Sequence, residues 1–194
     1  MGIIEITGSP CSGKSTILKN INVLGSNISL RCIYGNPYAK NNIFYMYAQK
    51  ILFFLMGWYL TSRPLKKFLL GKIYSSESHF IHRLRLFFYT FLKFGCQSYL
   101  LKVPSDKFII IDEGISHIPF NLFLTESEIS QYLSLLPQEY KKNKVYCVFD
   151  SESVLYSRLV KRGHKRLTNS EDAIKEFITK NNNVFNLIRI KYKI

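Results

Sequence analysis

The pattern of apolar and polar residues predicts strands that alternate with helices. Two runs in the second half of the chain are continuously apolar, which is typical of strands buried on both faces of a parallel sheet. A run at the C-terminus alternates apolar and basic residues, as a strand with one exposed face does. The expected strands are Ile3–Thr7, Ile28–Tyr34, Lys107–Ile111, Lys144–Phe149 and Ile188–Ile194. This pattern predicts an α/β fold with three layers, in which helices cover both faces of a parallel sheet.

The segments between these strands have helical periodicity. Residues 15–24 are expected to form a helix that ends at Gly25. Residues 42–101 are rich in aromatic side chains and predict two or three long helices, with breaks near Ser62–Pro64 and around Gly71–Ser78. Most of these aromatic side chains are expected to be core residues.

Two later helices are expected to begin with a Ser/Thr-x-x-Glu cap. These caps pair Thr125 with Glu128 and Thr168 with Glu171. No internal repeat and no Gly/Ser/Pro-rich linker divides the sequence, so residues 1–194 are expected to form one domain.

A glycine-rich segment between the first strand and the first helix has the spacing G-x-x-x-x-G-K-S. Its glycines let the backbone curl so that N–H groups point at phosphate oxygens, and the next helix adds its positive N-terminus. Lys14 is expected to reach the β- and γ-phosphates, and Ser15 to place its hydroxyl on magnesium. The predicted nucleotide-binding residues are Gly8, Ser9, Pro10, Cys11, Ser12, Gly13, Lys14, Ser15 and Thr16. The motif therefore predicts binding of a nucleoside triphosphate.

An acidic pair follows the third expected strand. A buried strand that ends in a carboxylate is typical of the second signature of such nucleotide-binding proteins, so Asp112 is the expected magnesium partner together with Ser15. Glu113 leaves two interpretations open. In ATPases a Glu at this position orients the attacking water, whereas in small-molecule kinases the carboxylates serve magnesium or the acceptor hydroxyl.

A basic segment follows the fourth expected strand. Arg158 and Arg162 are four residues apart and so share a helix face, which Arg166 continues. We interpret residues 153–168 as a lid whose arginines close on the triphosphate, offset the charge of the transferred phosphoryl group and exclude water. The alternative is a solvated basic helix face.

On these motifs the chain resembles the nucleoside and nucleotide kinases, and among them the thymidylate-kinase-like members, over Ile3 to about Arg166. The resemblance implies a parallel five-stranded sheet in the order 2-3-1-4-5, an acceptor region of helices at about residues 38–102, and adenine held near the lid. Kinases of this group commonly carry an acidic element after the second strand, which this sequence lacks. A general base must then come from Asp112, Glu113 or Glu77.

The expected acceptor region contains a group of basic side chains. His79, His82 and Arg83 fall on one helix face. His79 and Arg83 are the predicted acceptor-binding residues, because a guanidinium matches phosphate or carboxylate bidentately. His117 lies just beyond the acidic pair, but the sequence gives it no partner.

Net charge and cysteine content indicate the class of partner and the cellular compartment. With 27 Lys and Arg against 13 Asp and Glu, the net charge is +14, which favours nucleotides, nucleic acid or an anionic membrane as partners. The four cysteines have neither disulfide nor zinc spacing, and the motif begins too early for a signal peptide, so a cytoplasmic location is expected. No stretch is long enough to span a bilayer, but Leu65–Leu70 or the second helix of the acceptor region could contact a membrane surface.

These features together predict an enzyme. The expected activity is Mg²⁺-dependent transfer of a phosphoryl group from ATP to a small acceptor such as a nucleoside, a nucleotide or a sugar-like metabolite. The alternatives are an ATPase that uses Glu113 to activate water, and a nucleic-acid-directed protein suggested by the net charge and the aromatic helices. The sequence leaves the acceptor and the oligomeric state open.

Overall fold

The computed structural model of the protein describes residues 3–24, 28–32, 43–76, 79–102, 108–162 and 170–192. The strands are β1 (Ile3–Gly8), β2 (Ile28–Cys32), β3 (Phe108–Asp112) and β4 (Lys144–Val148). The helices are α1 (Lys14–Leu24), α2 (Ile43–Leu60), α3 (Arg63–Ser75), α4 (Phe80–Lys102), the 3₁₀ turn η1 (Ile115–His117), α5 (Ile118–Leu122), α6 (Glu126–Leu135), α7 (Gln138–Lys141), α8 (Glu152–Arg162) and α9 (Glu171–Tyr192).

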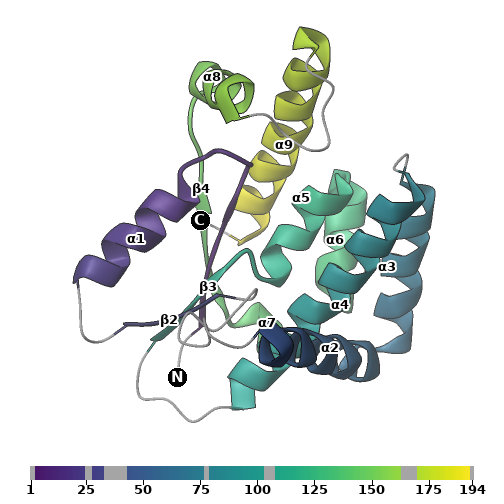
Figure 1. Ribbon diagram of the computed structural model, residues 1–194. Helices are drawn as coiled ribbons and strands as arrows, with labels where there is room; N and C mark the ends of the chain where they lie inside the picture. The colour runs from purple at the N-terminus through teal and green to yellow at the C-terminus, as the bar shows by residue number, and fades with distance from the viewer. Residues whose placement is uncertain are drawn as a thin grey trace.

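The four strands form one parallel sheet in the order β2-β3-β1-β4. Figure 1 shows α1 on one side of the strands and the helices from α2 to α6 on the other. The prediction of a three-layer α/β fold around a five-stranded sheet in the order 2-3-1-4-5 is wrong. The described residues are mostly helical, and their sheet has four short strands.

The residues described from the expected fifth strand are part of helix α9. Val184, Phe185 and Ile188 are buried at helical spacing, whereas Ile190, which the alternating pattern would bury, is 69% exposed. Alternation of apolar and basic residues over one or two helical turns is compatible with either structure, so the length of the periodic segment decides. Here the helical pattern begins at Glu171, and the helix continues to Tyr192, through the described part of the expected strand.

The other expected elements have close counterparts in the structure. The long region of helices is confirmed as α2, α3 and α4, but Gly71 lies inside α3 and does not break it. The cap at Thr125 is confirmed, because its backbone N–H donates to Glu128 Oε2 at 2.8 Å. Thr168 lies outside the described residues, and Ser170 Oγ accepts a bond from the third residue of α9.

Helices α2 and α4 touch backbone to backbone. A Cβ added at Gly57 would collide with the carbonyl oxygen of Phe91, and one added at Gly95 would collide with that of Phe53. The two glycines therefore allow an approach that no larger residue permits. This contact fixes α4 against α2, and Phe53 of α2 joins Leu92 of α4 in a second apolar cluster that also covers the strands.

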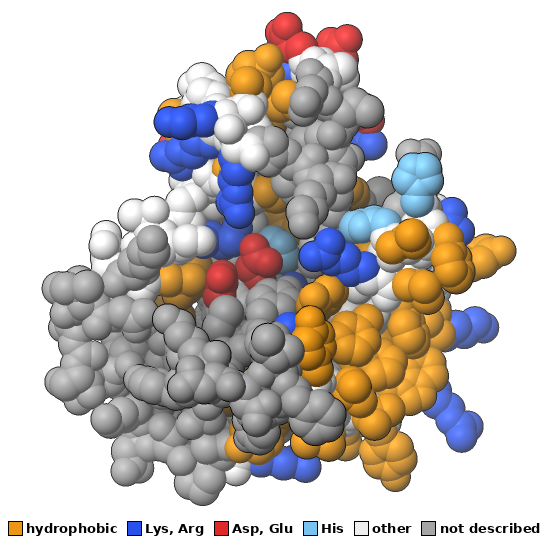
Figure 2. All heavy atoms as spheres, viewed as in Figure 1, with side chains coloured by type: hydrophobic (Ala, Val, Ile, Leu, Met, Phe, Trp, Pro, Cys, Tyr) orange, Lys and Arg blue, Asp and Glu red, His pale blue; other side chains and the backbone are white. Residues whose placement is uncertain are grey.

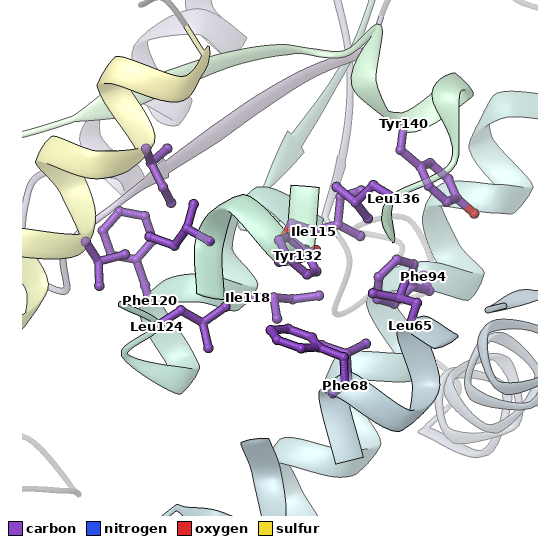
Figure 3. Packing of buried hydrophobic residues seen from close by; sticks show 14 of the residues in the cluster. Leu65, Phe68, Phe94, Ile115, Ile118, Phe120, Leu124, Tyr132, Leu136 and Tyr140 are labelled. Carbon is purple, nitrogen blue, oxygen red and sulfur yellow. Dashed lines mark hydrogen bonds between the residues drawn. The ribbon is translucent and has the colours of Figure 1, made fainter. Parts of the chain in front are cut away.

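The largest apolar cluster lies among the helices. Figure 3 shows side chains from α3, α4 and the segment from η1 to α7 converging on Tyr132, which is fully buried and donates its hydroxyl to the carbonyl of Ile115 at 3.0 Å. The fully buried members of this cluster come from helices and from the turns between them. The helices thus have their own core and can hold α4 rigidly beside the sheet.

A buried carboxylate connects three of these parts. Glu5 of β1 accepts hydrogen bonds from Gln97 of α4 at 2.7 Å, from Asn143 before β4 at 2.9 Å, and from the backbone N–H of Ser116 in η1 at 2.9 Å. These bonds place α4 and η1 at a fixed position beside the end of the sheet.

Candidate functional site

The candidate site lies where β1 and β3 end side by side. Ile6 pairs with Asp112 in the parallel register, and the N–H of Glu113 donates to the carbonyl of Ile6 at 3.0 Å. β1 then runs into residues 8–15, here called the glycine loop, and α1 begins at Lys14. Because parallel strands end at the same sheet edge, the acidic pair and the glycine loop are neighbours.

The backbone of the glycine loop depends on its glycines. Gly8 and Gly13 have φ angles of 145° and 92°, which side-chain-bearing residues rarely adopt. A Cβ at Gly8 would also collide with the carbonyl of Val148 on the neighbouring strand β4. Cys11 takes a left-handed φ of 66° at the outer part of the loop. The loop is therefore curled tightly against the sheet edge, as the motif predicts.

Lys14 lies across the base of this loop. Its ammonium donates to the carbonyl oxygens of Gly8 at 3.0 Å and Ser9 at 2.9 Å, and lies 3.4 Å from Glu113 Oε1. The side chain is almost fully buried. The positive charge predicted to meet phosphates is thus held between the loop and the acidic pair.

Two hydroxyls of the loop are buried without a partner among the described residues. These are Ser9 Oγ and Ser12 Oγ. A buried polar group without a hydrogen bond costs free energy, and an anionic oxygen bound in the loop would satisfy it. Ser15 and Thr16 are exposed in the first turn of α1, where the N–H of Thr16 donates to the carbonyl of Gly13 at 2.9 Å. Pro10 is only partly buried.

Asp112 faces this loop from the end of β3 and has an unusual environment. Its Oδ1 is buried and has no hydrogen-bond partner among the described residues. Burial, together with the neighbouring charge of Glu113, raises the pKa of Asp112 to about 6, although Lys14 and Lys93 oppose this. A carboxylate oxygen of this kind fits Mg²⁺, which takes one or two protein carboxylates and completes its shell with phosphates and water. The described residues hold no group of three or more His, Cys, Asp or Glu side chains that could bind a metal alone.

Glu113 has a basic side chain beside each of its two oxygens. Oε1 lies 3.4 Å from Lys14, and Oε2 lies 3.6 Å from His117 Nε2. His117 is positioned in turn by Thr7, whose hydroxyl lies 3.1 Å from Nδ1. Burial alone would raise the pKa of Glu113, but His117, Lys93 and Lys14 outweigh it and lower that pKa to about 2. Its backbone has a left-handed φ of 54°.

Sequence reasoning missed Lys93, which comes from α4. Its side chain is 1% exposed, and its ammonium has no hydrogen-bond partner among the described residues. Burial lowers the pKa of Lys93 to about 8, although Glu113, Glu5 and Asp112 attract its charge. A lone cation in the apolar stretch Leu92–Phe94 was the available signal, but only the fold brings it to the acidic pair. His117 likewise gains its partners from the fold.

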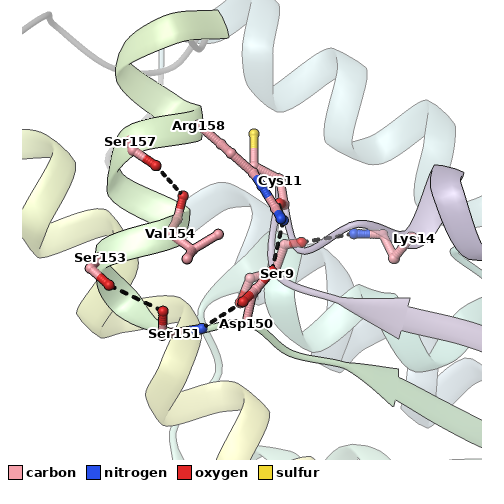
Figure 4. Close-up of polar contacts among 9 residues, drawn as sticks. All are labelled: Ser9, Cys11, Lys14, Asp150, Ser151, Ser153, Val154, Ser157 and Arg158. Atoms are coloured by element: carbon pink, nitrogen blue, oxygen red, sulfur yellow. Dashed lines mark hydrogen bonds and ion pairs between the residues drawn. The ribbon is translucent and has the colours of Figure 1, made fainter.

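Helix α8 contacts the glycine loop through Arg158, as Figure 4 shows. The guanidinium donates to the carbonyl of Cys11 at 2.9 Å and pairs with Asp150 at 2.8 Å. The side chain of Arg158 lies near Gly13 as well. Arg162 is exposed at the last residue of α8, and Arg166 lies outside the described residues with the rest of the predicted lid.

The predicted acceptor-binding residues lie away from this cluster along α4. The guanidinium carbon of Arg83 stacks over Tyr74 of α3, 5.8 Å from the ring centroid, and His79 is exposed just before the helix. Arg83 precedes Lys93 by ten residues, which is about 15 Å along a helix axis. Their role stays a prediction, and Glu77, a third candidate base, lies outside the described residues.

The space-filling view shows how the charged groups meet the surface. In Figure 2, acidic side chains appear in a hollow at the centre of the face, below α8, with basic side chains and a histidine around them. A polar ligand could therefore meet both acidic and basic side chains on this face.

The chain was also compared with known proteins. Searches against protein-family models, curated proteins and solved structures found no match. The chemistry of the site must therefore be inferred from its own geometry and charges.

Proposed function

We propose that the protein binds a nucleoside triphosphate with Mg²⁺ and transfers the terminal phosphoryl group to a small acceptor. One observation carries the proposal: four buried polar atoms that have no hydrogen-bond partner in the described part of the chain belong to the glycine loop and the groups near it. They are Ser9 Oγ, Ser12 Oγ, Asp112 Oδ1 and Lys93 Nζ. Two donor hydroxyls, a cation and a carboxylate match a phosphate chain with its metal, since each would gain a hydrogen bond or a ligand.

The glycine loop and Lys14 are assigned to the phosphates. Loop N–H groups, the N-terminus of α1 and the two serine hydroxyls would bind the phosphate oxygens, and Lys14 would shift from the loop carbonyls to the β- and γ-phosphates. Ser15 and Asp112 would hold Mg²⁺, which when bound neutralises phosphate charge and orients the terminal phosphoryl group.

The remaining charged groups are assigned to the transferred phosphoryl group and its acceptor. Glu113 keeps Lys14 and His117 in position through its two oxygens. Lys93 supplies a positive charge from α4 against the acidic pair, and Arg158 supplies another from α8 above the loop. Charges fixed before the reaction stabilise a developing negative charge without reorganisation.

The test is a comparison of ADP release with and without acceptors. Nucleosides, nucleoside monophosphates and sugars are each added to the protein with Mg·ATP, and a sample without acceptor is the control. Transfer predicts turnover that depends on one acceptor class. Equal turnover in water would instead support the ATPase alternative, in which Glu113 orients a water molecule.

Nucleotide binding is tested separately by calorimetry with Lys14→Ala. Loss of Lys14 should weaken ATP binding far more than ADP binding, because its ammonium serves the γ-phosphate as well as the β-phosphate. Lys161→Ala on the exposed side of α8 is the matched control and should bind both nucleotides as the wild type does. The proposal fails if wild-type protein binds no Mg·ATP, or if Lys14→Ala weakens both nucleotides equally.

A further inference from the structure

The outer face of α2 is a second feature that the proposed chemistry does not use. Five large side chains at helical spacing are between 54% and 84% exposed there. They are Tyr47, Ile51, Leu52, Leu55 and Tyr59, here called the α2 face. Single exposed apolar residues are common, but a continuous stripe on one helix marks an interaction site. Figure 2 shows hydrophobic side chains gathered over the region where Figure 1 places α2 and α3.

The α2 face is not needed to hold the helix in place. The opposite side of α2 contacts α4 through Gly57, and Phe53 of that side is buried in the second apolar cluster. The segment Leu65–Leu70, which the sequence offered as a membrane contact, is excluded because Leu65, Phe68 and Leu69 are buried in the largest core cluster. Helix α4, the other segment that the sequence offered, exposes Phe80, Ile81 and Leu84 in its first turns, whereas the α2 face extends along most of α2.

The charges around the α2 face have one sign. Between residues 43 and 76 the chain has five basic residues and no acidic one, which are Lys50, Arg63, Lys66, Lys67 and Lys72. Lys72 is paired with Glu128 of α6, so the basic rim consists of the other four. Two of these cations lie over aromatic rings of α2: Lys50 is 5.5 Å from the Tyr47 ring centroid, and Lys66 is 5.0 Å from that of Trp58. Apolar side chains, interfacial aromatic rings and a basic rim match the boundary of an anionic bilayer, where headgroups are negative and acyl chains begin.

The contact would lie in the plane of the membrane. Among the described residues, no helix is long and apolar enough to cross a bilayer. The inner side of α2 is also occupied by α4, so only one stripe of the helix can enter the interface.

We propose that the α2 face docks the protein on an anionic membrane surface, with its apolar side chains in the headgroup boundary and the basic rim on the lipid phosphates. The experiment uses vesicles of phosphatidylcholine alone, or with about 30% phosphatidylserine, and protein without nucleotide. Binding is measured by co-flotation and by the emission of Trp58, the only tryptophan of the chain, which is part of α2.

The protein should float with anionic vesicles, and these vesicles should shift its Trp58 emission to the blue. Neutral vesicles should bind at least about tenfold less, and raising the salt from about 0.1 M to about 0.5 M should release most of the protein, because the basic rim is screened. The double variant Leu52→Ser and Leu55→Ser should lose vesicle affinity by about tenfold or more. Val160→Ser, which alters an equally exposed apolar residue on α8, should bind as the wild type does.

The cationic rim is tested by Lys67→Glu against Lys161→Glu, both at exposed positions. Only the first should reduce binding to anionic vesicles. If the double variant does not fold, Tyr59→Ser replaces it, since that side chain is 84% exposed and supports no core. The proposal is overturned if the α2 variants bind as the wild type does, or if neutral vesicles bind the protein equally well. It is also overturned if the bound protein resists alkaline extraction, or if the protein forms a dimer in place of binding vesicles. All measurements omit nucleotide, so their failure leaves the proposed phosphoryl transfer untouched.

Discussion

Lys93 is a buried basic residue, and burial of its charge costs free energy. The ammonium is buried on α4 without a hydrogen-bond partner among the described residues, and burial lowers its pKa to about 8. A protein gains stability by replacing such a residue with an apolar one, so its presence at a cluster of carboxylates is best explained by chemistry. The sequence alone presents Lys93 as one more basic residue in an aromatic helix.

Lys93→Met is therefore expected to raise the free energy of unfolding at pH 7. From about pH 8 to 10.5 the unfolded chain keeps the Lys93 proton and the folded protein does not, so the free energy of unfolding of the wild type rises with pH across this window. The advantage of the variant, about 3 kcal/mol at pH 7, should shrink toward zero near pH 10.5. Urea unfolding measures it, with Lys102→Met at the exposed end of α4 as the control. A difference that stays constant with pH would contradict the assignment.

Arg158 and Arg162 looked equivalent in the sequence, because they share a helix face. Only Arg158 has a described contact with the glycine loop, through Cys11, and it also pairs with Asp150. Arg158→Ala should lower turnover by about 10³-fold or more with little change in ATP affinity, as loss of an arginine at a transferred phosphoryl group does. Arg158→Lys should restore little, because the planar fork is lost. Steady-state kinetics measures the turnover of these variants, with Lys161→Ala as the control. Wild-type turnover of Arg158→Ala would contradict a role of α8 in phosphoryl transfer.

At the scale of elements, local sequence patterns predicted the helices correctly where the periodic segment was long or where a cap marked its first residue. The helices α2 to α4 and the cap at Thr125 follow from periodicity and from side-chain hydrogen bonding that the sequence displays. The strand expected at Ile188–Ile194 failed because two periods fit so short a segment, and the core contacts of Val184 and Phe185 selected the helix. Tertiary packing of this kind is not visible in the sequence.

The crossing of α2 and α4 gives a test at this scale. Gly95→Ala should lower the free energy of unfolding by about 1 to 3 kcal/mol, because the new methyl group would force the helix backbones apart. Gly71→Ala is the matched control, since Gly71 is exposed inside α3 with open space around its Cα. That change should instead stabilise by up to about 1 kcal/mol through helix propensity. Urea unfolding curves compare the two, and equal effects of both alanines would show that the close crossing is absent in solution.

At the scale of the whole molecule, ligand binding should appear as added stability. Mg·ATP at about 100 times its dissociation constant would add about 2.7 kcal/mol to the free energy of unfolding. For a chain of this size the melting temperature should rise by about 5 to 10 °C. Thermal denaturation with Mg·ATP, Mg·ADP and neither measures it, and Lys14→Ala should lose most of the shift with ATP. Absence of any shift at millimolar Mg·ATP would contradict nucleotide binding.

The whole-molecule prediction from the sequence was the least accurate. The motif predicted the curled backbone of the glycine loop, and the apolar run predicted the strand that ends at Asp112, because both patterns reflect local backbone geometry. The five-stranded sheet was inferred from a resemblance, and the described residues form four strands and a core that lies mostly among helices. Which helix brings a distant cation such as Lys93 to the site depends on that core, and no short segment contains this information.

Glu5 has a consequence for how substitutions in this protein would be tolerated. Its carboxylate accepts from Gln97, Asn143 and Ser116, so even Glu5→Gln would replace an accepting oxygen with an NH₂ group that faces another donor, at a cost of about 1 to 3 kcal/mol. A saturation-mutagenesis survey scored by activity would therefore rank Glu5 with Lys14 as intolerant, although the proposed chemistry gives Glu5 no role. Scoring the same library by the abundance of folded protein should separate them: Glu5 variants become scarce, whereas Lys14 variants accumulate without activity.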